Sequence, residues 1–455
     1  MAFVTIDPAT GQKLASHREH SSRQIAELVA RSRSAFESWR TTSLHERGRV
    51  LRRIAKTLLR RRDELARLIT SEMGKPLAQS VAEIEKSAAA CEFYAAHASE
   101  FLASRRPPHA PANARVSFAP LGPVLAIMPW NFPFWQTLRA AAPALMAGNT
   151  FLLKPAPATS GCGVALAGLF SDARIPPDLF LTLLIEPPAI AKLIADPRLA
   201  AVTLTGSTRA GKSVAALAGA AMKPATFELG GSDAYLILGD ADLDRAAKIC
   251  AQSRLINSGQ SCIAAKRFIV ERRVRRDFER RLVAEMSAAR VGSPLDPSTN
   301  IGPLARADLR DHLHSQVRRS IARGARVLLE GGPLPDRPGF FYAPVVLTDV
   351  APGMPAYDEE LFGPVASIIV VRDEAEAVRI ANQSAYGLGS GVFTRSRTRA
   401  QRVAAQLEAG NVAINDFVRS DPSLPFGGVK DSGHGRELGE WGLHAFTNIK
   451  TIVAH

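Results

Sequence analysis

The first hundred residues carry apolar side chains at spacings of three and four, the period of a helix that buries one face. In residues 21–39 these positions include Ile25, Leu28, Val29, Phe36 and Trp39. Residues 43–73 and 77–102 repeat the pattern, and a proline-rich break follows at 106–111. The pattern predicts three helical stretches, followed by an extended segment at 114–118.

After Gly122 the pattern changes to short apolar runs separated by helical stretches. The runs that predict buried strands are 124–128, 150–153, 180–184 and 201–205. A second series extends from 234 to about 415, with strands predicted at 235–238, 267–270, 366–371 and 411–414. Strands that alternate with helices indicate parallel, doubly wound α/β sheets. Such sheets bind ligands at the carboxyl ends of their strands.

Composition excludes several classes of protein. The chain has 455 residues, of which 46% are hydrophobic and 22% charged, which is ordinary for a globular protein and unlike a disordered one. No apolar run is long enough to cross a membrane, and residues 1–20 do not resemble a signal peptide, so we expect no membrane partner. The four cysteines are scattered, which fits neither a disulfide framework nor a zinc site. We therefore expect a cytoplasmic protein without a bound metal.

The net charge of +14 raises the question of an anionic partner. Basic residues mostly lie in mixed stretches with acidic ones, which is typical of solvated helix faces. Aromatic residues are only 6% of the chain, too few for the stacking surfaces that bind single-stranded nucleic acid. We expect no nucleic-acid partner.

A glycine-rich loop follows the predicted strand at 201–205 and opens a predicted helix. Residues 206–213 (GSTRAGKS) match the phosphate-loop pattern G-x-x-x-x-G-K-[ST]. In a nucleoside triphosphatase, Lys212 would bind phosphate and Ser213 magnesium, but the nearest candidate for the second magnesium ligand, Asp240, is poorly placed. A loop that binds the phosphates of a dinucleotide fits better, since a helix N-terminus attracts anions.

Cys262 closes a polar, glycine-containing turn at 257–262. Core packing is the usual role of a single cysteine, and we expect it for Cys91, Cys162 and Cys250, which lie in apolar helical stretches. The neighbours of Cys262 cannot form a core. Backbone amides in such a turn can activate a thiol and stabilise an oxyanion.

Two further polar residues lie close to predicted strand ends or glycines. Glu228 stands between Phe227 and Leu229, and a carboxylate in apolar surroundings suits a general base; a paired structural carboxylate is the alternative. Asn131 follows the strand at 124–128, where its amide can donate to an oxyanion, or can simply form a turn before Phe-Pro.

Together, these segments resemble the aldehyde dehydrogenase family. The matching segments, in order, are 129–133 (PWNFP), 154–156 (KPA), 205–207 (TGS), 228–231 (ELGG), 259–262 (GQSC), 360–364 (ELFGP) and 425–428 (PFGG). The resemblance covers nearly the whole chain. It implies two doubly wound α/β domains plus a β oligomerisation arm, and a homodimer or homotetramer. The implied domains are a dinucleotide-binding domain (1–104 and 121–229), a catalytic domain (230–432) and an oligomerisation element (105–120 and 433–455).

The resemblance also implies a mechanism. Cys262 would attack the aldehyde carbon, and its backbone N–H and the Asn131 amide would bind the oxyanion. The resulting thiohemiacetal would lose a hydride to NAD or NADP, and Glu228 would activate the water that hydrolyses the thioester.

Several residues would then bind the cofactor. Lys154 would reach the adenosine ribose, and Glu360 and Phe362 the nicotinamide end; the pyrophosphate contacts would be Trp130, Gly206, Ser207 and Gly211. NAD-selective members often have a glutamate where this chain has Pro157, so NAD and NADP both remain open.

The substrate is inferred from the closest resemblance, which is to the shorter bacterial succinate-semialdehyde dehydrogenases. Arg139 matches an arginine that binds the distal carboxylate, and Ser420 a substrate-loop serine; a second arginine of related enzymes is Ile256 here, for which Arg419 is the substitute. Phe132, Trp135 and Phe426 would line the tunnel. The alternatives are an Arg139 that merely pairs with a protein carboxylate, an aliphatic or aromatic aldehyde as substrate, a non-catalytic binding protein on this scaffold, and the phosphate-loop triphosphatase.

Overall fold

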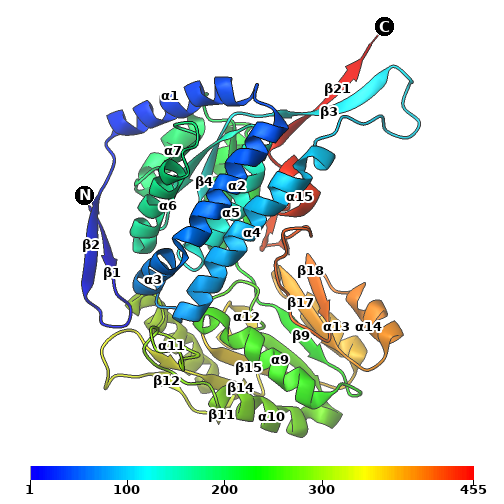
Figure 1. Cartoon of the computed structure of the whole chain (residues 1–455). Helices are drawn as coiled ribbons and strands as arrows, with labels where there is room; N and C mark the ends of the chain where they lie inside the picture. The colour runs from blue at the N-terminus through cyan, green and yellow to red at the C-terminus, as the bar shows by residue number, and fades with distance from the viewer. Residues whose placement is uncertain (1, 455) are drawn as a thin grey trace.

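Two open sheets, each flanked by helices, form the body of the computed structural model, which describes residues 2–454 (Figure 1). The first sheet has the strand order β20-β8-β7-β4-β5-β6. Its parallel strands are β4 (Pro123–Ile127), β5 (Thr150–Lys154), β6 (Phe180–Thr182), β7 (Ala201–Thr205) and β8 (Ala225–Glu228), and β20 (Gly433–His434) joins antiparallel. All four predicted strands are present, and β8 and β20 are additional.

The second sheet has the order β11-β14-β15-β10-β9-β17-β18. Its strands are β9 (Ala234–Ile237), β10 (Arg267–Glu271), β11 (Arg326–Leu329), β14 (Val345–Thr348), β15 (Val365–Val371), β17 (Gly389–Phe393) and β18 (Asn411–Ile414). All pairs are parallel except that of β11 with β14. The four predicted strands are again present, and the expected α/β class is confirmed.

The helices around the first sheet are α1 (Ser22–Trp39), α2 (Leu44–Arg60), α3 (Arg62–Met73), α4 (Leu77–Phe101), α5 (Pro133–Met146), η1 (Pro157–Thr159), α6 (Ser160–Asp172), α7 (Pro187–Ala195) and α8 (Thr208–Ala220). Those of the second half are α9 (Leu243–Leu255), η2 (Ile256–Gly259), η3 (Arg272–Val274), α10 (Arg275–Ser287), α11 (Ala307–Ala322), α12 (Pro355–Asp358), α13 (Glu374–Asn382), α14 (Arg397–Ala404) and α15 (Gly439–His444). The single helical stretch predicted at 43–73 is two helices, because the backbone of Arg61 leaves helical geometry.

Four two-stranded ribbons complete the fold. They pair β1 (Ala2–Ile6) with β2 (Lys13–Arg18), β12 (Gly332–Pro333) with β13 (Tyr342–Ala343), β16 (Tyr386–Gly387) with β19 (Val429–Lys430), and β3 (Ala114–Pro120) with β21 (Thr447–Val453). The β3–β21 ribbon projects from the body (Figure 1). Before it, β20 joins the first sheet and α15 contacts α4 and α5. The domain boundaries themselves stay a prediction.

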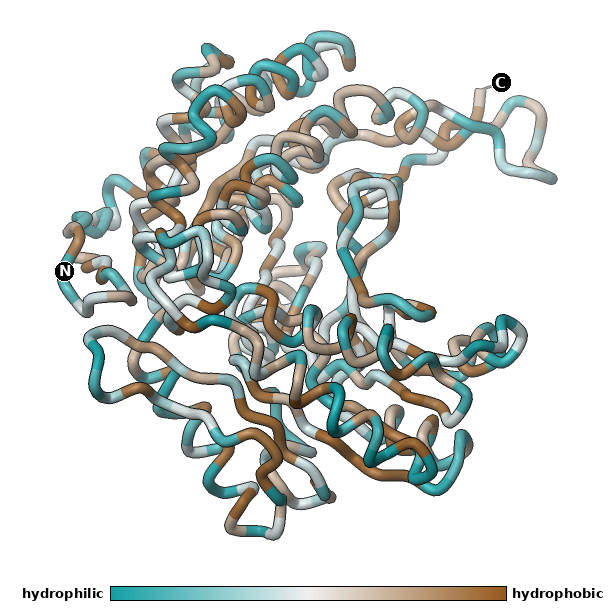
Figure 2. The backbone as a smooth tube through the Cα atoms, turned by 60° about the horizontal axis from the view of Figure 1, so that its bottom comes forward, coloured by the Kyte–Doolittle hydropathy of each residue, from teal (hydrophilic) through white to brown (hydrophobic). Residues whose placement is uncertain are grey.

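Hydrophobic residues concentrate in the interior strands, whereas the outer helices present polar residues (Figure 2). Each sheet packs helices against both faces in hydrophobic clusters of its own. Among residues 2–454, no helix has the length and apolar character needed to cross a membrane.

The strand order of the first sheet reverses beside β4. From β4 the chain builds outward through β5 and β6, then returns to place β7 on the other side of β4. This reversal falls beside β4, and the carboxyl ends of strands at such a reversal, here β4 and β7, are where open α/β sheets bind ligands. A loop that precedes a strand of the second sheet reaches this edge: Gln260, in the loop of Cys262 before β10, accepts a hydrogen bond from Asn131 after β4.

Candidate active site

Four of the predicted site residues lie at the ends of four adjacent strands of the first sheet. Asn131 lies after β4, Lys154 ends β5, Ser207 follows β7 and Glu228 ends β8. The strand register pairs Ile127 with Lys154, so these ends are level. Parallel strands therefore bring residues that are distant in sequence to one edge of the sheet.

A buried ion pair fixes the loop that carries Asn131. The Lys75 ammonium binds a Glu83 carboxylate oxygen at 2.5 Å and donates to the main-chain oxygen of Asn131 at 2.8 Å. The other carboxylate oxygen of Glu83 accepts from the backbone N–H groups of Phe134 and Trp135, at the start of α5. Glu83 thus satisfies two backbone N–H groups at the positive, N-terminal end of α5 and holds the loop that leads into this helix. The sequence analysis missed this pair, since both residues resemble ordinary helix charges.

Replacing Lys75 with methionine is expected to lower the free energy of unfolding by about 3–5 kcal/mol, because Glu83 would remain buried without its cation. Both side chains are fully buried. Urea denaturation measures the loss. Arg23→Met is the control, because its pair with Glu27 is exposed and worth at most about 1 kcal/mol. A Lys75→Met loss as small as that of the control would contradict this account.

The turn that presents Cys262 is conformationally unusual. Three consecutive residues, Asn257, Ser258 and Gly259, have φ of 56°, 54° and 77°, in the left-handed region that side chains disfavour. A side chain at Gly259 would collide with the backbone at Gly363. Such strain persists only where surrounding contacts enforce it. The turn is therefore braced against the loop that carries Glu360 and Phe362.

Lys266 provides the second brace of the turn. Its ammonium is 2% exposed and donates to the carbonyl oxygens of Ser261 at 3.0 Å and Cys262 at 2.7 Å. It also forms an ion pair with Glu360 at 3.3 Å. Lys266 thus couples the nucleophile turn to the predicted nicotinamide-ribose residue. The sequence analysis did not single it out.

The Cys262 side chain is partly exposed, unlike the buried Cys91, Cys162 and Cys250, whose predicted core role is confirmed. Burial of its sulfur raises the pKa of the Cys262 thiol to about 12, against the opposing attraction of Lys266 and Arg139, and the charges of Glu228 and Glu360 add to the rise. At neutral pH the thiol is protonated. The predicted lowering of its pKa by backbone amides is therefore not found, and attack requires removal of a proton.

The Asn131 amide reaches the cysteine turn rather than closing a turn of its own. Its nitrogen donates to the Gln260 carbonyl at 3.0 Å, and its oxygen accepts from Gln136 at 3.2 Å. One N–H of the amide remains for a developing oxyanion beside Cys262. The side chain is 4% exposed, so this geometry is held by packing.

Glu228 has no partner of its own. It is 2% exposed, and neither carboxylate oxygen makes a hydrogen bond or ion pair with any residue in 2–454. Burial and the nearby negative Glu437 raise the pKa of Glu228 well above its ordinary value, although Arg139 and Arg436 oppose the rise. The alternative of a paired structural carboxylate does not fit. An unpaired carboxylate with a raised pKa fits a general base.

The residues predicted to bind the dinucleotide lie at the carboxyl edge of the first sheet. The Lys154 ammonium is 7% exposed but makes no hydrogen bond or ion pair within the described chain, and burial lowers its pKa. Ser207 caps α8, and Gly211 is needed there because a Cβ would collide with Leu229. An unsatisfied cation and an open helix N-terminus suit ribose hydroxyls and a pyrophosphate, respectively. Gly206, between β7 and Ser207, completes this loop.

Trp130, after β4, and Phe362, before β15, meet edge to face, with ring centroids 5.7 Å apart. The Glu360 carboxylate accepts from the backbone N–H of Gly231 at 3.0 Å. A Cβ at Gly230 would lie 2.6 Å from that carboxylate, so the glycine pair lets Glu360 approach the strand end. Glu360 and Phe362 are the residues predicted at the nicotinamide end, and Trp130, predicted near the pyrophosphate, lies against Phe362.

Cys262 opens onto a cavity of about 1100 Å³. Its lining includes every predicted substrate residue: Phe132, Trp135, Arg139, Arg419, Ser420 and Phe426. The predicted tunnel residues pack as one apolar cluster with Cys262 and Ile263. The cavity therefore combines apolar walls with cationic groups.

The two predicted arginines already have carboxylate partners. Arg139 forms a buried ion pair with Glu437, donates to Thr205 at 3.3 Å and stacks 5.1 Å from the Phe426 ring centroid. The alternative in which Arg139 pairs with a protein carboxylate is thus observed. Arg419 binds Asp416 at 2.7 Å and lies over Phe417. The sequence analysis singled out neither Glu437 nor Lys86, which is a further cation of the cavity.

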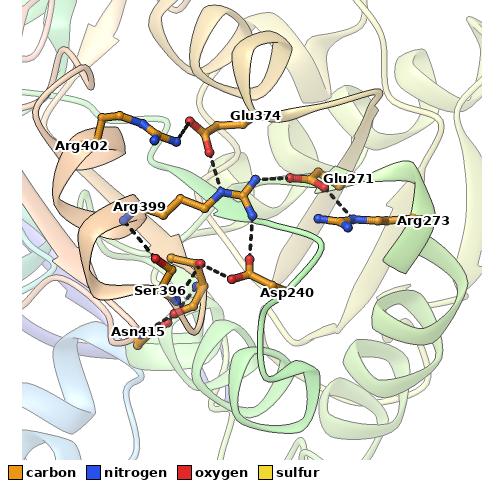
Figure 3. A network of polar contacts seen from close by, with 9 residues as sticks. Asp240, Glu271, Arg273, Glu374, Ser396, Arg399, Arg402 and Asn415 are labelled. Carbon is orange, nitrogen blue, oxygen red and sulfur yellow. Dashed lines mark hydrogen bonds and ion pairs between the residues drawn. The ribbon is translucent and has the colours of Figure 1, made fainter.

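The triphosphatase alternative is wrong. The Lys212 ammonium pairs with Asp431 at 2.8 Å. The candidate magnesium ligand Asp240 follows β9 in the other sheet, where it binds Arg399 at 2.7 Å within a surface network that includes Glu271 and Glu374 (Figure 3). No cluster of His, Cys, Asp and Glu that could hold a metal occurs in residues 2–454. The glycine-rich loop at 206–213 and Asp240 therefore do not form a common magnesium site.

Comparison with known proteins agrees with this geometry. The model of the aldehyde dehydrogenase family matches residues 1–452. The chain is 45% identical to the succinate semialdehyde dehydrogenase [NAD(P)+] Sad of Escherichia coli, over 99% of this chain and 97% of the relative. It is 45% identical to a probable succinate-semialdehyde dehydrogenase [NADP(+)] of Synechocystis, over 99% of both chains.

Solved structures agree as well. The succinic semialdehyde dehydrogenase of Streptococcus pyogenes in complex with NADP+ superposes with a TM-score of 0.96 at 36% identity, covering all of both chains. The succinate-semialdehyde dehydrogenase of Burkholderia pseudomallei gives 0.96 at 34% identity, over 100% of this chain and 94% of that one. A family match over nearly the whole length, on a site with this thiol, carboxylate and amide, has one interpretation: the chain belongs to the aldehyde dehydrogenase family.

Proposed function

We propose that this protein oxidises succinate semialdehyde to succinate with NAD or NADP as oxidant. The observation that carries the proposal is the cavity, where the Cys262 thiol shares apolar walls with the cationic Arg139 and Lys86. Cationic groups suit a substrate that bears a carboxylate. The names of the full-length relatives point to the same substrate.

The residues of the chain divide the chemistry between them. The Cys262 thiol opens onto the cavity, where its proton passes to solvent as the sulfur adds to the aldehyde carbon. The Asn131 amide and the Cys262 backbone N–H hold the resulting oxyanion. A nicotinamide cofactor held by Lys154, Ser207 and Glu360 would supply the acceptor for the hydride of this carbon, and the loss of that hydride would leave a thioester on Cys262. Glu228 then takes a proton from water, whose oxygen attacks the thioester. The acid and the Cys262 thiolate are released, and the proton on Glu228 returns to the sulfur.

For the cofactor, we propose that both NAD and NADP are used. Lys154 and Ser207 would hold the adenosine ribose and the pyrophosphate, and Glu360 the nicotinamide ribose. Pro157 puts no carboxylate beside the adenosine ribose to repel a 2′-phosphate. The relatives include one named for NAD(P)+ and one for NADP(+).

We also propose a cytoplasmic homodimer or homotetramer. Support for assembly comes from the β3–β21 ribbon, whose Ile449 is 62% exposed and whose Val453 is 50% exposed. Apolar residues on a projecting strand pair are typical of a surface that another subunit covers. Four free cysteines without a disulfide support a reducing compartment.

The test is formation of reduced cofactor with succinate semialdehyde, butanal and benzaldehyde, each with NAD and with NADP. We expect the semialdehyde to have the highest kcat/KM, by about 10-fold or more over butanal, because only it can use the cationic wall. A preference for butanal or benzaldehyde would refute the substrate and leave the aldehyde chemistry intact. Absence of turnover with every aldehyde would refute both.

A further inference from the structure

Lys86 is a cation in the substrate cavity without a carboxylate partner. It lies on α4, half-buried, and its ammonium donates to the Ser420 hydroxyl at 2.7 Å. It also lies 4.2 Å from the ring centroid of Trp135. No carboxylate in residues 2–454 comes within ion-pair distance of it. A charge held by only a hydroxyl and an aromatic face has unused capacity for an anion.

The carboxylates that face Lys86 are engaged elsewhere. Asp421 accepts from the backbone N–H and the hydroxyl of Ser423 at 2.9 and 2.6 Å. Glu83 is occupied by Lys75 and by the backbone at the start of α5. Both carboxylates lie beyond ion-pair distance of Lys86, so they attract its charge only from farther away.

The other cations of the cavity are less available. Arg139 is neutralised by the buried Glu437, and Arg419 by Asp416. Lys248 also lines the cavity, but its side chain is exposed to solvent. An exposed ammonium contributes little to binding because water screens it. Lys86 therefore combines burial with an unsatisfied charge.

We propose that Lys86 and Ser420 form the subsite that binds the distal carboxylate of the substrate. This inference rests on the proposed function. Trp135 connects the two ends of the site, since it touches Lys86 and packs in the same cluster as Cys262. The carboxylate would accept from the ammonium and from the hydroxyl, while the chain of the substrate lies along the apolar wall.

The decisive variant is Lys86→Met, assayed with succinate semialdehyde and with butanal, which has the same chain length and no carboxylate. The KM for the semialdehyde should rise about 10- to 100-fold, the loss of a hydrogen bond to a charged group, with kcat nearly unchanged. The KM for butanal should stay within about twofold. Lys86→Arg should retain most of the affinity, and Lys248→Met, the matched control on α9, should change neither KM.

The pH dependence gives a second readout. Burial and the repulsion of Arg139 on α5 lower the pKa of Lys86 to about 8, while Asp421 and Glu83 attract its proton. The charge is thus present below that pH and lost above it. The ratio of kcat/KM for the semialdehyde to that for butanal should fall as pH rises through about 8 in the wild type. In Lys86→Met the ratio should be flat.

Calorimetric binding of succinate separates this inference from the proposed function. If the wild type binds succinate through Lys86 but does not oxidise the semialdehyde, the substrate proposal fails and the subsite stands. If the wild type oxidises the semialdehyde and Lys86→Met affects both aldehydes equally, or neither, the subsite is refuted and the function stands.

Discussion

Cys262→Ala is expected to reduce aldehyde oxidation by about 10⁴-fold or more with every aldehyde, since no other group can form the covalent intermediate. Cofactor affinity should be almost unchanged, because the sulfur is not among the predicted cofactor contacts. The rate is followed by the absorbance of the reduced cofactor, and the affinity by calorimetry. The fold should survive, since the side chain is partly exposed.

Cys91→Ala is the matched control. It removes a thiol buried in the core that α4 shares with the first sheet, so it should lower stability without lowering kcat/KM. If Cys262→Ala retained more than about a tenth of the wild-type rate, a covalent route through this thiol would be refuted.

The strand-end residues were predictable from sequence because local pattern alone places them. A short apolar run that ends at a polar or glycine-rich turn puts Asn131 and Ser207 at the carboxyl edge of a parallel sheet. Cys262 stood apart because its neighbours cannot form a core. At the short strand β8 the hydrophobic pattern is less clear, so Glu228 was identified as a candidate but its strand was not predicted.

The charged residues that tune the site could not be predicted in this way. Lys75, Lys86 and Lys266 lie in or beside segments where a lysine normally faces solvent. Only the packing of α4 on α5, and of the cysteine turn on the Glu360 loop, brings their charges inside. The pairing of Arg139 with Glu437 joins positions that are 298 residues apart, and nothing local indicates it.

Glu228→Gln separates the two halves of the reaction. The charge of Glu228 raises the pKa of the Cys262 thiol, so its removal should not hinder acylation. Hydrolysis of the thioester loses its base, and kcat should fall by about 10²- to 10⁴-fold. Rapid mixing should therefore show a burst of about one reduced cofactor per site, followed by slow turnover, and mass spectrometry should detect acylated Cys262.

This variant should also fold at least as well as the wild type. The pKa of Glu228 is higher in the folded than in the unfolded protein. At a pH above its pKa in the unfolded protein, the carboxylate therefore lowers the free energy of unfolding, because its charge is disfavoured when buried. Glutamine carries no charge and removes this destabilisation. The urea midpoint at neutral pH is thus expected to stay or rise. Glu92→Gln, on the exposed side of α4, should change neither the burst nor the midpoint. Slow turnover without a burst would mean that Glu228 is needed to deprotonate Cys262, and would assign it to the first half of the reaction instead.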